Sequence, residues 1–351
     1  MTVDCIGRRS LNGVLLLGSL LTLFAVNSAW ALDPNNHISQ YAHTVWRIQD
    51  GVFTGIPHTI AQTADGYVWI GTEGGLVRFD GVRFVAWTEP AGEHLLNDSV
   101  HSLLGSRDGS LWIGTRHGLS HCTNGHLVNY PELIRRINAI VEDQRGTVWT
   151  VNSRSEGKQN GALCEVADGK SRCYNATDGL NCPYGNALDI DREGNVWVGS
   201  TSALCKWKDG SSETYLQKEL KATEALTGVM GIAAGNDGSL WVGIGRPGKD
   251  LGLRQFVGGA WRSYSVPGMD GSGLSVNKLL LDRNNALWIG TVNRGIYRVH
   301  NGQADHFGSA DGLSSDSIED FFEDRRGATF DPRSDSPPTR HLGQRTNSPA
   351  S

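Results

Sequence analysis

A short phrase built around tryptophan and glycine recurs six times along this chain of 351 residues. A full copy reads Gly-Ser-Leu-Trp-Ile-Gly-Thr, at residues 109–115. The copies occupy residues 66–72, 109–115, 146–150, 194–200, 238–243 and 285–291. Their tryptophans are 43, 37, 48, 44 and 47 residues apart, and each interval holds several strand-like runs. A period of about 44 residues with several strands is typical of propeller blades. The sequence therefore predicts an all-β fold, a β-propeller.

The second copy illustrates the sequence pattern of one four-stranded blade. Apolar and polar residues alternate in its first run, and turn residues separate it from three further runs. The expected strands are residues 100–104, 111–113, 119–122 and 127–130. Asn124-Gly125 joins the last two, and Asx followed by Gly between alternating runs is a strong hairpin signal. Six such blades are recognisable.

The repeated tryptophans have a structural explanation. Each recurs at the same place in its second strand, so each is expected to fill the space between adjacent blades, where a large ring buries apolar surface. We assign this blade-core role to Trp69, Trp112, Trp149, Trp197, Trp241 and Trp288. The glycine that follows is expected to let the backbone approach its neighbour closely.

A seventh blade begins but does not continue. Residues 318–327 match a first strand and its turn, whereas the following residues are polar and rich in Pro, Ser and Arg. We therefore expect a propeller over residues 32–328 and a disordered tail over residues 329–351. Such a chain would be a truncated product with an open seam. Alternatively, residues 43–48 supply a closing strand and the ring still forms.

The N-terminus has the order of a secretory signal peptide. Arg8 and Arg9 precede the apolar run from Val14 to Val26, and small residues precede a cleavage site after Ala31. An uncleaved anchor is the alternative, although the run is shorter than the roughly 20 residues that span a membrane. We expect residues 1–31 to direct export to the periplasm or the medium.

Five of the six cysteines follow this signal, so an oxidising compartment is expected for them. Asp168-Gly169 forms a two-residue hairpin signal that places Cys164 opposite Cys173 at a non-hydrogen-bonded position, within disulfide range. We predict that bridge. Cys122, Cys182 and Cys205 receive no assignment.

The phrase Asp-x-x-Gly-x-(Leu/Val)-Trp-(Ile/Val)-Gly-Thr, followed by Gly-Leu, resembles the two-component regulator propeller repeat. The opening at residues 46–52 and the phrases at 177–180 and 310–313 fit the same pattern. The resemblance spans roughly residues 42 to 328. It implies a periplasmic sensor of a membrane-bound receptor whose output is a histidine kinase or a diguanylate cyclase. This sequence shows no kinase or cyclase motif, so a non-catalytic fragment is expected, with homodimers formed by a full-length receptor.

Other chemistry is weakly indicated. Residues 243–249 have the spacing of a phosphate loop, but Asp250 follows where Ser or Thr would hold magnesium, and strands flank the segment. His117, His121, Cys122 and His126 are close in sequence, yet alternation and a turn separate their side chains. We expect no metal and no cofactor. A net charge of −5 without a basic block argues against nucleic acid.

Ligand contacts are expected on the loops between second and third strands, which emerge at one face of a propeller. Two of these loops, at residues 152–161 and 244–252, are longer than the others. The candidate residues are Glu73, Arg116, His117, Arg154, Lys158, Arg246, Lys249, Asn293 and Arg294. Polar and cationic groups there suit a carbohydrate or an anionic metabolite. The alternatives are a secreted propeller enzyme, such as a lyase or glycosidase-like hydrolase, and a protein-interaction platform.

Overall fold

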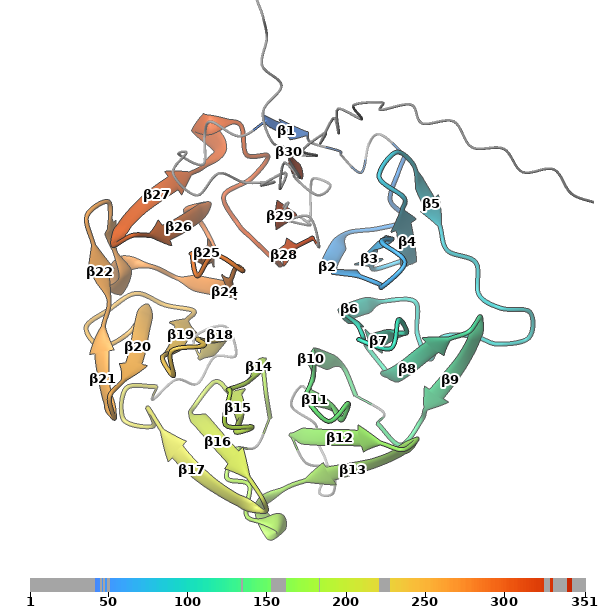
Figure 1. Cartoon of the computed structure of the whole chain (residues 1–351), viewed down its shortest axis with the longest axis horizontal. Helices are drawn as coiled ribbons and strands as arrows, with labels where there is room; N and C mark the ends of the chain where they lie inside the picture. Colours follow the sequence, from blue (N-terminus) through green and yellow to red (C-terminus); the bar gives the residue numbers. More distant parts are fainter. Residues whose placement is uncertain are drawn as a thin grey trace, which may run out of the picture.

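Six four-stranded antiparallel sheets surround a central axis in the computed structural model (Figure 1). The structure describes residues 42–44, 46, 48, 51–133, 135–152, 162–182, 184–220, 228–324, 329–330 and 340–342. In each blade the first strand lies nearest the axis and the fourth lies outermost. The predicted propeller of four-stranded blades is confirmed, because consecutive strands pair in sequence order within every blade.

The blades have the following strands. The first comprises β2 (Pro57–Gln62), β3 (Val68–Thr72), β4 (Gly75–Phe79) and β5 (Phe84–Ala86), and the second β6 (Val100–Gly105), β7 (Leu111–Thr115), β8 (Gly118–Thr123) and β9 (His126–Tyr130). The third comprises β10 (Ile137–Glu142), β11 (Val148–Asn152), β12 (Leu163–Ala167) and β13 (Lys170–Tyr174), and the fourth β14 (Ala187–Ile190), β15 (Val196–Gly199), β16 (Leu204–Lys208) and β17 (Ser211–Tyr215). The fifth comprises β18 (Val229–Ala234), β19 (Leu240–Ile244), β20 (Leu253–Val257) and β21 (Ala260–Ser263), and the sixth β24 (Val276–Leu281), β25 (Leu287–Thr291), β26 (Ile296–His300) and β27 (Gln303–Phe307).

The glycine of the repeated phrase lies where adjacent blades touch. A Cβ on Gly71 would lie 2.5 Å from a methyl carbon of Val100 in the next blade, and one on Gly243 would lie 2.2 Å from Val276. The third blade reverses this arrangement. It carries Val151 at the glycine position, and Gly185, just before β14, supplies the space: a Cβ on Gly185 would lie 2.6 Å from the Val151 Cβ. Each blade contact therefore holds one small and one branched residue, because two branched residues would overlap.

In the third, fourth and sixth blades, an aspartate in the turn before the tryptophan accepts the indole N–H. In the fourth blade, one Asp191 carboxylate oxygen accepts the backbone N–H groups of Glu193 and Asn195, at 3.0 and 2.9 Å. The other oxygen accepts the Nε1–H of Trp197 at 2.8 Å. In the first blade the Trp69 indole instead donates to the hydroxyl of Thr63, at 2.9 Å. The six repeated tryptophans are between 0% and 8% exposed, in clusters between blades.

Short 3-10 helices connect some blades and explain the Asp-Gly-Leu phrase. In η3 (Ala176–Asp178), the Asp178 carboxylate accepts the N–H of Asn175, and Gly179 ends the helix with φ +92°. Leu180 then enters the core. The same turn recurs at η6 (Ser309–Asp311). Glycine suits this position because its lack of a Cβ makes a positive φ accessible.

The seventh sector, between the sixth and first blades, holds two short strand pairs. β28 (Phe322–Glu323) pairs with β29 (Thr329–Phe330), and β1 (Ala42–Thr44) pairs with β30 (Arg340–Leu342). Thus β29 and β30 lie within residues 329–351, for which composition predicts disorder. Backbone pairing, which composition does not register, accounts for these two strands: β29 pairs with the nearby β28, and β30 pairs with the distant β1. The other residues of that tail lie outside the described residues.

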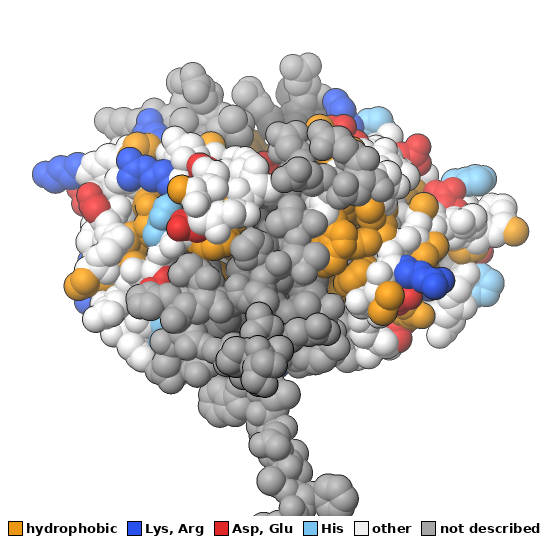
Figure 2. Space-filling model, turned by 90° about the horizontal axis from the view of Figure 1, so that it is seen from above, with side chains coloured by type: hydrophobic (Ala, Val, Ile, Leu, Met, Phe, Trp, Pro, Cys, Tyr) orange, Lys and Arg blue, Asp and Glu red, His pale blue; other side chains and the backbone are white. Residues whose placement is uncertain are grey.

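The sixth and first blades are also joined directly. Asp320 is 6% exposed, and its carboxylate accepts the Thr59 hydroxyl at 3.0 Å and the Ile60 N–H at 3.3 Å. It also contacts the Lys278 ammonium group at 2.7 Å. One carboxylate therefore links β24 to β2 across the seventh sector. Figure 2 shows hydrophobic side chains at the rim beside this sector.

The described residues form two disulfides. Cys164 and Cys173 face each other on β12 and β13, with 4.0 Å between their Cα atoms, and their sulfurs are bonded. A second bridge joins Cys182, in the connection to the fourth blade, to Cys205 on β16. Among the described residues Cys122 is a free thiol. The expected signal peptide lies outside the described residues, within which no helix has the length and apolarity to cross a bilayer.

Candidate functional site

First strands begin, and second strands end, at the same face of the ring, which we call the upper face. Five of the first strands have a register shift near this end, a bulge that redirects one side chain. The bulged residues are His58, His101, Asn138, Met230 and Asn277. Asn138 and Asn277 donate to backbone oxygens of the following blade or sector, at 2.7 Å in both cases.

The two bulged histidines form a stacked pair. The rings of His58 and His101 lie 4.7 Å apart with 28° between their planes. His101 Nε2 is 3.1 Å from the Ser99 hydroxyl, whereas His58 Nε2 is buried with no hydrogen-bond partner among the described residues. The nearest carboxylate oxygen to His58 Nε2 is that of Glu73, at 3.8 Å. A buried imidazole nitrogen without a partner is a feature that a ligand could satisfy.

Both imidazoles are neutral at pH 7. Burial lowers the pKa of His101 to about 4, and electrostatic repulsion from Arg136, from Arg116 and from His58 whenever that ring is protonated acts in the same direction. Burial also lowers the pKa of His58, although the carboxylates of Glu73 and Glu319 act in the opposite direction. Perturbed titratable groups that converge from several elements are a common property of functional sites.

Two guanidinium groups complete this histidine–arginine cluster, which consists of His58, His101, Arg116, Arg136 and Glu73. Arg116 lies in the turn between β7 and β8, and Arg136 precedes β10. The Arg136 Nε–H donates to the Asn138 side-chain oxygen at 2.8 Å. Burial and the nearby Arg116 lower the pKa of Arg136. Within the described part of the chain neither arginine has an ion pair, so their charges remain available to an anion.

The structure brings together some of the residues expected from the sequence and separates others. Glu73 and Arg116 join the cluster, and His117 is next to Arg116 in its turn. Arg246 donates instead to the backbone oxygen of Glu219, at 3.2 Å. Arg294, in the turn between β25 and β26, lies beside Asp270 and Gly273, which belong to the connection between the fifth and sixth blades. Lys249 and Asn293 lie in their predicted loops, and Arg154 and Lys158 lie outside the described residues.

Sequence reasoning missed His58, His101 and Arg136. A signal was available, because a polar residue follows the first residue of most first strands, as in Pro57-His58 and Val100-His101. Alternation alone assigns that residue to one face of a regular strand. The bulge that turns it toward the next blade is a property of strand pairing.

Two further histidines noted in the sequence, His121 and His126, lie in the second blade, and each contacts another side chain. The His121 ring stacks on Trp112 at 3.9 Å, and His126 pairs with Glu93 at 3.2 Å. Among the described residues, no group of three or more His, Cys, Asp or Glu side chains is placed to hold a metal ion. The segment with phosphate-loop spacing joins strand β19 to strand β20, as its sequence context indicates.

Comparison with known proteins identifies related folds. The structure is similar to the extracellular domain of a hybrid two-component system of B. thetaiotaomicron, with a TM-score of 0.70 and 18% identity over 86% of this chain and 41% of that chain. It is similar to the extracellular domain of a one-component system of the same organism, with a TM-score of 0.63 and 16% identity over 88% of this chain and 43% of that chain. The chain thus spans less than half the length of these two sensor chains.

A third similar structure is an enzyme, the virginiamycin B lyase of Staphylococcus aureus. The TM-score is 0.63 and the identity 16%, over 86% of this chain and 99% of the lyase. At these identities the likeness shows a common fold. No significant match was found among curated proteins.

The sequences of two repeats match a family model, which is more specific than a shared fold. The family model described as two component regulator propeller matches residues 51–74 and 94–117. These segments contain the first two strands of the first and second blades, with the repeated phrase at the end of each. Two segments of the chain therefore match the two-component regulator propeller repeat.

Proposed function

We propose that this protein is an exported, non-catalytic propeller that senses a small anionic ligand at its upper face. The observation that carries the proposal is the convergence of Arg116, Arg136 and two neutral histidines from different blades, with no ion pair for either arginine among the residues that the structure describes. The similarity to extracellular domains of two-component and one-component systems supports a sensory role.

The chemistry of the cluster indicates how such a ligand would be held. Guanidinium groups bind carboxylate or phosphate through paired, charge-assisted hydrogen bonds. Neutral imidazoles offer both a donor and an acceptor, which suits the hydroxyl groups of a sugar acid. In a receptor, binding would favour one arrangement of the sensor over another and so bias the output domain.

The test is calorimetric titration with glucuronate and galacturonate, with glucose as the neutral comparison. Arg116→Ala and Arg136→Ala are each expected to weaken binding of the sugar acids at least about tenfold, the loss of one charge-assisted contact. Arg83→Ala, an exposed arginine in the turn between β4 and β5, is the control and should bind normally. Binding that is indifferent to both cluster arginines, or binding of glucose alone, would overturn the proposal.

A second candidate function is a lyase, favoured by one feature of the same cluster. Histidines that are neutral at pH 7 beside a carboxylate can accept a proton from a substrate. Replacing one histidine of the S. aureus lyase by alanine inactivates that enzyme. The test is incubation with quinupristin, followed by chromatography and mass spectrometry. Product that forms with the unaltered protein but not with His101→Ala would establish the lyase, and unchanged quinupristin would exclude this activity.

A further inference from the structure

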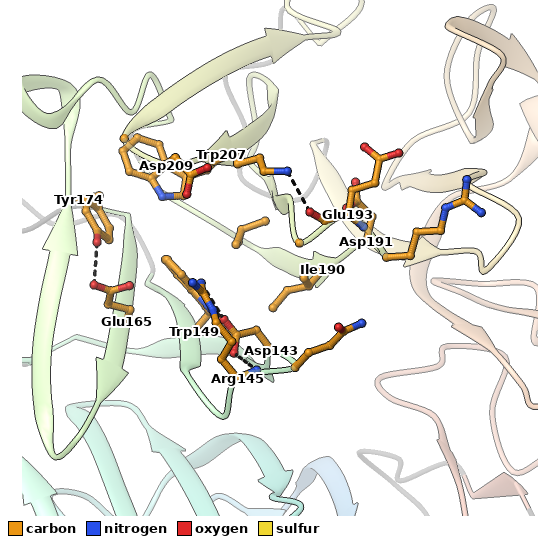
Figure 3. A pocket seen from close by; sticks show the side chains of 16 residues that line it. Asp143, Arg145, Trp149, Glu165, Tyr174, Ile190, Asp191, Glu193, Trp207 and Asp209 are labelled. Carbon is orange, nitrogen blue, oxygen red and sulfur yellow. Dashed lines mark hydrogen bonds and ion pairs between the residues drawn. The ribbon is translucent and has the colours of Figure 1, made fainter.

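A cavity of about 440 Å³ lies between the third and fourth blades (Figure 3). Its edge is at the end of these blades opposite the histidine–arginine cluster. Turns between first and second strands and between third and fourth strands form its edge, and these turns emerge at the lower face. It is lined by Asp143, Gln144, Arg145, Trp149, Glu165, Tyr174, Ile190, Asp191, Arg192, Glu193, Gly194, Val196, Trp207, Lys208, Asp209 and Gly210. Neither the sequence pattern nor the proposed sensory site uses this space.

Aromatic rings form part of the wall. The Tyr174 ring lies 4.8 Å from that of Trp207 and 6.1 Å from that of Trp149. The Tyr174 hydroxyl donates to Glu165 at 2.7 Å, which places a carboxylate directly beside the ring. In Figure 3, Tyr174 and Glu165 stand on one side of the opening, and Asp191 and Glu193 stand on the other.

The lining carries five carboxylates and three cations. The cations are already engaged: Arg145 contacts Asp143 at 3.3 Å, Lys208 donates to the Glu193 backbone oxygen at 3.0 Å, and Arg192 donates to the Asn236 backbone oxygen at 3.1 Å. Asp143 and Asp191 are likewise occupied by their turns.

Three carboxylates keep acceptor capacity toward a ligand. Glu165 receives the tyrosine hydroxyl on one oxygen, and Glu193 receives one long contact from Asn195, at 3.4 Å. In the described part of the chain, no side chain or backbone group donates a hydrogen bond to the Asp209 carboxylate. The cavity therefore combines aromatic wall, negative charge and unused acceptors.

A corresponding gap in the same molecule shows that the repeat does not require these features. The cavity between the fifth and sixth blades is about 180 Å³ and holds Trp241 and Tyr264 at the equivalent positions. Val299 replaces Trp207 there, and Asn301 replaces Asp209. Asp237 is the one carboxylate in that lining. The gap between the third and fourth blades thus differs from the gap between the fifth and sixth blades in its larger volume and its negative charge.

We propose that this cavity binds an organic cation, a compound with an alkylammonium group. Its charge would lie among Glu165, Glu193 and Asp209, and its carbon atoms would contact the aromatic wall. Carboxylates supply the opposite charge, and aromatic faces attract cations through their quadrupole. This second site is independent of the ligand proposed for the upper face.

The experiment is calorimetric titration of the full protein with putrescine and choline, with glucose as a neutral probe and acetate as an anionic one. Glu165→Gln keeps the hydrogen bond to Tyr174 and removes the charge, and Asp209→Asn removes the charge of an exposed side chain. Each is expected to raise the dissociation constant for the amines at least about tenfold, as the loss of one charged contact would. Asp98→Asn, an exposed site with the same change in net charge, should leave the affinity unchanged.

The outcomes separate the alternatives. Amine binding that depends on Glu165 and Asp209 but not on Asp98 supports the site. No amine binding, an equal loss in all three variants, or preferential binding of glucose overturns it. Circular dichroism of each variant shows that it is folded, and Arg116→Ala should leave amine binding intact because that residue belongs to the upper face.

Discussion

At the scale of single residues, polar side chains do two different tasks in this propeller. Turn carboxylates such as Asp191 accept backbone N–H groups and an indole N–H, and so hold the tryptophans of the third, fourth and sixth blades in place. The bulged histidines lie at the upper face, where burial keeps them neutral. The first task recurs in three blades, whereas the second distinguishes the first two blades from the others.

We predict that Asp191→Ala lowers the free energy of unfolding by about 2 kcal/mol, because buried donors lose their acceptor. Asp65→Ala in the first blade should cost less than half as much, since the Trp69 indole donates to Thr63 there. Urea unfolding followed by tryptophan fluorescence measures both. Equal losses would contradict the anchoring role of the Asp191 carboxylate.

We also predict a pH dependence that arises from His101. Its pKa in the folded protein is about 4, below the ordinary value of 6.5. Between these two pKa values the unfolded chain takes up a proton that the folded chain does not. The free energy of unfolding therefore decreases as the pH falls from 6.5 toward 4, and no such loss occurs above pH 6.5. Melting temperatures across that interval should vary less steeply for His101→Gln than for the unaltered protein. Parallel curves would rule out a contribution from this histidine.

At the scale of elements, the second strand of each blade is the unit that meets its neighbour. Its glycine receives a branched side chain from the next first strand, and the third blade achieves the same fit with Val151 and Gly185 exchanged. The repeated Trp-Ile-Gly phrase thus encodes the spacing between sheets as well as a strand.

We predict that Gly243→Val destabilises the protein by about 3 kcal/mol, because its Cβ would overlap Val276. Val276→Gly alone should also be destabilising, through a cavity and a more flexible chain. The double variant, which copies the arrangement of Val151 and Gly185, should recover at least about 1 kcal/mol relative to the sum of the single effects. Chemical denaturation measures the free energies of unfolding. If the two single losses simply add up in the double variant, a small and a branched residue do not compensate for each other at this contact.

At the scale of the whole molecule, the ring depends on a contact between residues near its two ends. Asp320 accepts hydrogen bonds from Thr59 and Ile60, 261 and 260 positions away, and pairs with Lys278 of the sixth blade. Asp189 makes a comparable contact between adjacent blades, where it accepts the Ala234 N–H at 2.8 Å.

We predict that Asp320→Asn lowers stability by about 2 kcal/mol, because it breaks a largely buried charged contact. Amide hydrogen exchange should quicken in β2 and β24, on both sides of the seventh sector. Asp189→Asn serves as the matched variant, and its effect should stay within β14 and β18. Exchange that is unchanged in β2 would show that closure does not depend on Asp320.

The sequence by itself determined the strands, the turns, the buried tryptophans and the pairing of Cys164 with Cys173. All of these follow from spacing and alternation within about one repeat, where chain connectivity leaves few arrangements. Only the tertiary structure decided that His58 stacks on His101, that Cys182 meets Cys205, and that Asp320 reaches Thr59. These contacts depend on bulges, on the curvature of the ring and on which loops converge. The residues involved are far apart in the sequence, and no local sequence pattern predicts that they come into contact.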